Sequence, residues 1–274
     1  MLRRVHGTRA VGTLYGQRAL LMQATHPLAF AGLMANTDGL DAPFRRLART
    51  AQTMEKVFFG SRAEADVVLE RVRRMHARVN GELTAPAGRY DAGASYSADS
   101  PEFLLWILAC IADSALAVYE RLVRELDPAE REAYWGDYVR LGELFGLDRA
   151  DAPVNYAELR AYMYERLRSD DLFVIEQAHE IGRQVAFDLP LPASRAPALP
   201  MINFLLVGLL PSRVRHLYGL RWNPARQAAH DALCRSLRLG ARVSPATIRR
   251  GPTHAAYGLV ARTEQKRLAR EPAA

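Results

Sequence analysis

Apolar residues recur at helical spacing along most of the chain, and this periodicity limits the fold more than any other feature. The clearest case is residues 61–81, SRAEADVVLERVRRMHARVNG. Ser61 followed by Glu64 is the pattern of a capping box, which begins a helix, and Gly81 is expected to supply the left-handed residue that ends it. Between them, at alternating spacings of four and three, one helical stripe carries Ala65, Leu69, Val72, His76 and Val79.

Prolines mark the starts of further helices. Residues 19–37 carry no charge, but Gln23 and His26 inside this run would be costly in lipid. We therefore expect two buried helices, the first ending near Thr25 and the second beginning at Pro27. Pro43 and Pro101 precede two more apolar helical stretches. The chain shows no internal repeat and no strand alternation of useful length. The prediction is an all-α fold in one helical domain, residues 1–274, with a basic, loosely structured tail over 251–274.

The charge balance does not point to a nucleic-acid partner. The formal net charge is +7, from 37 basic and 30 acidic residues. The arginines are scattered at helical spacing with acidic neighbours, as in YERLVRELDPAERE, which is typical of a solvated surface rather than a binding patch. Two cysteines, Cys110 and Cys234, are too few for a disulfide framework or a zinc site. A reducing cytoplasm is the default location. The sequence leaves a peripheral membrane contact open and does not indicate the oligomeric state.

His76 has two interpretations on spacing alone. A lone imidazole on an apolar face is most often a core histidine whose nitrogens bond a carbonyl or a water. A neutral imidazole facing an apolar interior is also what a haem iron needs as its axial ligand. Periodicity does not decide between the two.

Other polar side chains on apolar helices could converge with His76. Arg46 and Thr50 are four residues apart and share one helical face, while Arg49 and Thr53 form a second pair on a neighbouring face. His26 precedes Pro27 at the end of the uncharged run.

Several segments, in order, carry a family resemblance: YGQRALLMQATHPLAFAG, RRLARTAQTMEKVFFG, MHARVNG, YSADSPEFLLWILACIADSALAVYE, EREAYWGDY and VGLLPSRVRHLYGL. Over roughly residues 10–250 the chain resembles the MpaB / rubber-oxygenase catalytic domain family, which includes the latex-clearing proteins. The resemblance implies an all-helical protein with a globin-like core that holds haem b. Characterised members cleave carbon–carbon double bonds of isoprenoid chains with dioxygen.

The resemblance also implies roles for individual residues. His76 matches the histidine that binds the haem iron, so it would be the metal ligand. Arg46 and Thr50 match two positions of an Arg-x-x-Lys-Thr segment near the haem, and Arg49 stands where that segment has lysine. Arg46 and Arg49 would then contact the cofactor, and Arg46 and Thr50 would serve the reaction. His26 matches a common His-Pro pair, either as a distal acid–base group or as a structural cap for the next helix.

Two departures leave the substrate open. Arg49 offers no lone pair where the family has lysine. Between residues 20 and 43 there is no glutamate to serve as the base in rubber cleavage, and the only acids are Asp38 and Asp41. The resemblance therefore implies a haem b-dependent oxygenase acting with dioxygen on a small hydrophobic substrate, isoprenoid or lipid-like. The alternatives are a haem-dependent peroxidase or oxidase, and a non-enzymatic haem-binding or gas-sensing protein.

Overall fold

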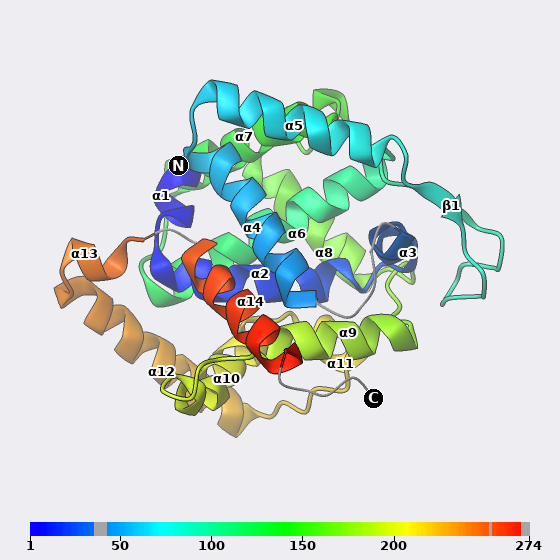
Figure 1. Ribbon diagram of the computed structural model, residues 1–274. Helices are drawn as coiled ribbons and strands as arrows, with labels where there is room; N and C mark the ends of the chain where they lie inside the picture. The colour runs from blue at the N-terminus through cyan, green and yellow to red at the C-terminus, as the bar shows by residue number, and fades with distance from the viewer. Residues whose placement is uncertain (36–42, 252–253, 270–274) are drawn as a thin grey trace.

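The computed structural model describes residues 1–35, 43–251 and 254–269, and regular structure in this part of the chain is almost entirely helical (Figure 1). The all-α fold class is confirmed. One antiparallel ribbon of two short strands packs beside the helix formed by Pro27–Ala35. In chain order the elements are Leu2–His6 (α1), Arg9–Gln23 (α2), Pro27–Ala35 (α3), Pro43–Phe59 (α4), Arg62–His76 (α5), Asn80–Glu82 (β1), Ser95–Ser97 (β2), Pro101–Leu122 (α6), Pro128–Phe145 (α7), Arg149–Asp151 (η1), Tyr156–Arg168 (α8), Glu176–Phe187 (α9), Ala196–Ala198 (η2), Leu199–Leu209 (α10), Ser212–Leu217 (α11), Pro224–Val243 (α12), Ala246–Arg249 (α13) and His254–Leu268 (α14).

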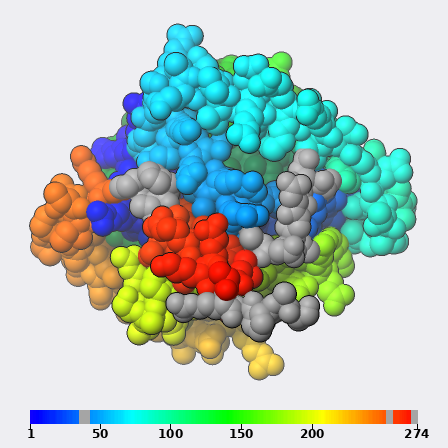
Figure 2. Space-filling view, in the orientation of Figure 1, coloured from blue at the N-terminus to red at the C-terminus, as the bar shows by residue number. Residues whose placement is uncertain are grey.

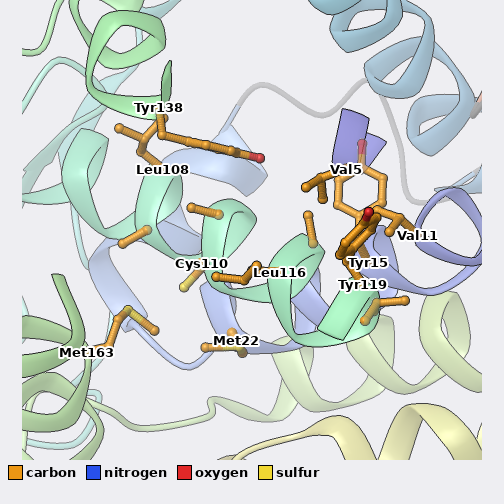
Figure 3. Close-up of a cluster of buried hydrophobic side chains, with 14 of the residues drawn as sticks. Val5, Val11, Tyr15, Met22, Leu108, Cys110, Leu116, Tyr119, Tyr138 and Met163 are labelled. Atoms are coloured by element: carbon orange, nitrogen blue, oxygen red, sulfur yellow. The ribbon is translucent and has the colours of Figure 1, made fainter. Parts of the chain in front are cut away.

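Helix α6 lies in the middle of the molecule. Pro101 occupies its first turn, where the missing proline N–H removes no helical hydrogen bond. Helices α2, α7 and α12 pack around it. In Figure 3, Leu108, Cys110 and Leu116 of α6 lie among side chains from α1, α2, α7 and α8. By length and composition α6 is the one described helix that could cross a membrane, yet 67% of its apolar segment is buried inside the protein.

The uncharged run of residues 19–37 forms two helices, as expected from its sequence. Helix α2 ends at Gln23 and α3 begins at Pro27. Thr25 between them donates its hydroxyl hydrogen bond to the carbonyl of Met22 and satisfies an end carbonyl of α2. The last two residues of the run, 36 and 37, lie outside the described residues, as do Asp38 and Asp41.

A buried arginine joins α2 to the rest of the core. Arg18 is 4% exposed, and its guanidinium donates to the carboxylate of Asp113, the hydroxyl of Ser114 and the carbonyl of Leu209. These partners offset the cost of removing its charge from water. Helices α2, α6 and α10 are therefore held in register by one side chain.

Helix α5 begins as predicted but ends earlier. Ser61 and Glu64 form the full capping box. The helix ends at His76, whose carbonyl accepts from the Val79 N–H in the turn that follows. The expectation that Gly81 ends the helix is wrong, because Gly81 pairs with Tyr96 in the ribbon. A Cβ at Gly81 would lie 2.7 Å from the Tyr96 hydroxyl, so this position needs glycine for close approach to a ring.

The C-terminal region differs from the loose tail expected over 251–274. Its described part includes α14, which packs along α4 (Figure 1). Tyr257, Val260 and Ala261 of α14 are buried there. Glu264, 7% exposed, accepts hydrogen bonds from the backbone N–H groups of Phe44 and Arg45 at the start of α4. A carboxylate at a helix N-terminus is electrostatically favourable, so α14 fixes the first turn of α4.

Candidate functional site

His76 is the last residue of α5 and lies half-buried on the helix face that also carries Leu69. Its ring makes no hydrogen bond in the described part of the chain, and its Nδ1 atom is buried. Burial lowers the pKa of His76, because desolvation disfavours the imidazolium, and the nearby Asp99 carboxylate offsets only part of this effect. The side chain is therefore a neutral imidazole at neutral pH.

The other buried or half-buried histidines with described side chains all have partners for a ring nitrogen. His6 lies 2.6 Å from the Tyr138 hydroxyl, and His230 lies 3.2 Å from the carbonyl oxygen of Leu205. The ring of His179 contacts the carbonyl of Tyr218. A core histidine normally satisfies its nitrogens in this way. His76 departs from that pattern, which leaves it available for a ligand.

Helix α4 carries Arg46 and Thr50 on one face, as the spacing predicts. Arg46 is half-buried, and its Nη2 donates to the carbonyl of Leu33 at 3.0 Å. Burial lowers the pKa of Arg46, and the positive charge of Arg49 adds to this effect. Thr50 is exposed although Arg46 and Met54, four residues before and after it, are both half-buried.

Helix α6 has an apolar stripe that is not fully covered. Leu104, Ile107 and Ile111 follow at spacings of three and four, and each keeps part of its surface exposed while packing on the core. The space-filling view shows a hollow between α4 and α5 in which atoms of the green region, from α6 onward, lie deeper (Figure 2). Helices α4 and α5 border this hollow, and its deeper atoms come from the green region of the chain.

Arg49 lies away from the half-buried face of α4 and is exposed. It is close enough to Arg46 for its positive charge to lower the pKa of Arg46. A role for Arg49 in holding a cofactor stays a prediction.

His26 is fully buried in a polar network. Its Nε2 lies 3.3 Å from the Tyr90 hydroxyl and 3.7 Å from the Glu102 carboxylate. Burial lowers the pKa of His26 to about 4, although Glu102 acts in the opposite direction. The ring does not cap α3, because its Nε2 contacts are side chains and its buried Nδ1 has no partner among the described residues.

No spacing pattern in the sequence predicts the residues around His26. Asp171, from the loop after α8, accepts from Tyr90 and from Arg166, and it pairs with Arg89 at 2.7 Å. Arg166 also pairs with Glu102. These groups come from four separate segments, so only tertiary structure brings them together.

A second cavity, of about 430 Å³, lies on the opposite side of α6. Its charged side chains are paired with one another: Arg160 contacts Asp113, and Arg131 contacts Glu120. Charges already satisfied in this way leave little to bind a ligand, so the hollow near His76 is the stronger candidate.

The described residues include no group of three or more His, Cys, Asp or Glu side chains arranged to hold a bare metal ion. A haem iron needs only axial ligation from the protein. One neutral histidine on the inward face of α5 therefore fits the axial ligation that a haem needs, and it would not by itself form a metal site of another kind.

The chain is similar to known proteins over most of its length. Residues 3–239 match the family model described as ER-bound oxygenase mpaB/B'/rubber oxygenase, catalytic domain. Two uncharacterized mycobacterial proteins, Mb2261 of Mycobacterium bovis and Rv2237 of Mycobacterium tuberculosis, are each 27% identical over 204 residues. These matches cover 74% of this chain and 76% of each relative. No solved structure matches the chain significantly.

Proposed function

Since the chain belongs to the mpaB/B'/rubber oxygenase catalytic domain family, and is thus an oxygenase-type enzyme, we propose that it binds haem b and oxidises a hydrophobic substrate with dioxygen. The observation that carries the haem proposal is the His76 imidazole on the inward face of α5, neutral and without a hydrogen-bond partner among the described residues. A haem bound there would supply the iron at which dioxygen is activated.

The residues of the hollow have distinct tasks in this proposal. His76 offers a ring nitrogen to the iron, and burial keeps that nitrogen unprotonated. Arg46 brings a positive charge to the rim, where a propionate carboxylate would pair with it. The exposed Thr50 hydroxyl, one turn further along the same face, donates a hydrogen bond to a polar atom in the hollow.

The base of the hollow supports a hydrophobic substrate. Leu104, Ile107 and Ile111 offer apolar surface without a charge, which excludes water and favours an apolar chain over a polar molecule. His26 would act as the acid–base group, since Tyr90 and Glu102 link its Nε2 to the carboxylate and guanidinium groups of the network. The isoprenoid or lipid-like nature of the substrate is part of the proposal.

The first experiment is an absorption spectrum of protein purified from haem-supplemented cells, with a pyridine haemochromogen assay for stoichiometry. Wild type is expected to hold about one haem b per chain. His76→Ala should lose it, and imidazole added to His76→Gly should restore the Soret band. His216→Ala, at an exposed histidine, is the matched control and should keep its haem. A colourless wild type, or a His76→Ala variant with an unchanged spectrum, would reject the proposal.

Oxygen labelling tests the chemistry. With a panel of terpenoid and lipid substrates, ¹⁸O from labelled dioxygen should appear in the product. Turnover that requires peroxide and incorporates no oxygen from dioxygen would instead identify a peroxidase.

A further inference from the structure

The turn between α12 and α13 lies at an outer corner of the molecule (Figures 1 and 2), and the residues around it include exposed apolar side chains. Leu239 and Val243 are 60% and 84% exposed on the outward face of α12, and Ile248 of α13 is 60% exposed just after the turn. An aliphatic side chain this far exposed is unremarkable when it is alone. Three within ten residues of a rigid helix–turn–helix form a patch, named here the α12–α13 patch.

Positive charge surrounds the α12–α13 patch. Between Asp231 and Glu264 the sequence has six arginines and no acidic residue. Arg238 is neutralised by Glu125 at 3.0 Å. In the described part of the chain, no carboxylate forms an ion pair with the four remaining exposed arginines nearest the patch, Arg235, Arg242, Arg249 and Arg250.

The patch is firmly attached to the body of the protein. Arg250 forms a backbone bridge with Thr8, and its carbonyl accepts from Nε of Arg9 at 2.9 Å. The Gly251 N–H donates to the carbonyl of Gly7. Arg9 is itself exposed and adds a further positive charge at this corner. The side chains are thus presented on a fixed platform rather than on a loose tail.

We propose that the α12–α13 patch docks the protein onto the surface of an anionic lipid bilayer. Aliphatic tips flanked by arginines match the layered chemistry of such a surface, where apolar groups enter the acyl boundary and cations meet the phosphates. A nucleic acid would use the arginines but gain nothing from exposed valine and isoleucine. The inference does not depend on the proposed function, although a membrane is also where a lipid-like substrate would be found.

The test is co-sedimentation of the protein with vesicles of phosphatidylglycerol and phosphatidylcholine in equal parts, compared with phosphatidylcholine alone. Wild type should bind the anionic vesicles and lose most of that binding in 0.5 M salt, because screening removes the arginine contribution. Arg242→Gln combined with Arg249→Gln should weaken binding by roughly fivefold per arginine. Leu239→Ser with Val243→Ser should weaken it by roughly tenfold or more.

Val154→Ser is the matched control, because Val154 is 85% exposed but lies far along the chain from the patch. Its vesicle binding should equal that of wild type. Circular dichroism of each variant checks that the fold is retained. Absence of wild-type binding to anionic vesicles, or equal loss in the Val154→Ser control, would overturn the proposal. Sedimentation velocity showing a wild-type dimer that the Leu239→Ser/Val243→Ser variant loses, with vesicle binding unchanged, would assign the patch to a second copy of the chain.

Discussion

The contact between Glu264 and the start of α4 gives a prediction whose size follows from the structure. The two carboxylate oxygens accept from the backbone N–H groups of Phe44 and Arg45 at 3.3 and 3.0 Å. Glu264 is 7% exposed, so water does not readily replace it. In Glu264→Ala, both N–H groups lose their acceptor and the helix terminus loses a negative charge.

The expected loss combines two terms. Removing a side chain that caps a helix start costs about 1 kcal/mol, and up to about 2. Removing a partly buried charge from the positive end of a helix costs about 1 kcal/mol, up to about 2 in favourable geometry. Glu264→Ala should therefore lower the free energy of unfolding by about 2–4 kcal/mol. For a chain of this size, that corresponds to a fall in Tm of about 5–12 °C.

The assay is urea unfolding followed by circular dichroism, combined with hydrogen exchange of the α4 amides. Glu264→Gln, which keeps the shape and one acceptor oxygen but not the charge, should lie between wild type and Glu264→Ala. Gln265→Ala, at the exposed neighbouring position, should change stability by less than about 0.5 kcal/mol. The reasoning is refuted if Glu264→Ala is as stable as wild type, or if it is less stable while exchange in the first turn of α4 stays unchanged.

Three further predictions rest on buried contacts. The pKa of His26 is lowered to about 4 on folding, so the unfolded chain binds the proton first as pH falls from 6.5 to 4. The free energy of unfolding of the wild type should therefore fall over this pH window. In His26→Gln this fall should be smaller by up to about 3 kcal/mol, as measured by urea titrations at several pH values. Parallel pH profiles for the two proteins would contradict the prediction. Arg18→Met leaves Asp113 and two other acceptors without the guanidinium. In the same assay it should lower the free energy of unfolding by about 3 kcal/mol or more, and a loss below about 1 kcal/mol would mean that the network is not stabilising. Gly208→Ala would place a Cβ 2.2 Å from the His230 ring and should lower the free energy of unfolding by about 1–3 kcal/mol. The same substitution should cost much less in a His230→Ala background, and equal costs in both backgrounds would argue against this clash.

The helix starts could be read from the sequence because their determinants are local. The Ser61–Glu64 capping box and the prolines at positions 27, 43 and 101 each fix a helix start through neighbouring backbone groups. The end of α5 could not be read in this way. Position 81 holds glycine because the Tyr96 ring of the paired strand lies against it. That contact depends on strand pairing between residues distant in the sequence.

The C-terminal helix shows the same limit. The α14 sequence is weakly amphipathic, and its buried face is defined by α4, more than 200 positions earlier.

For the candidate site, helical spacing correctly put His76 on the inward face of α5 and Arg46 with Thr50 on one face of α4. It could not show that His76 has no hydrogen-bond partner among the described residues, or that His26 contacts Tyr90 and Glu102. Both facts depend on how segments that are distant in the sequence pack together.

The clamp between Glu264 and α4 also sets an order of events during synthesis. The residues it joins are 220 positions apart, so a growing chain must be synthesised past Glu264 before the first turn of α4 can be capped. Contacts between such distant segments form late in folding. Helix α4, which carries Arg46, is thus fully supported only when α14 has docked along it. A polypeptide that stops before α14 would carry His76 and Arg46 without this support.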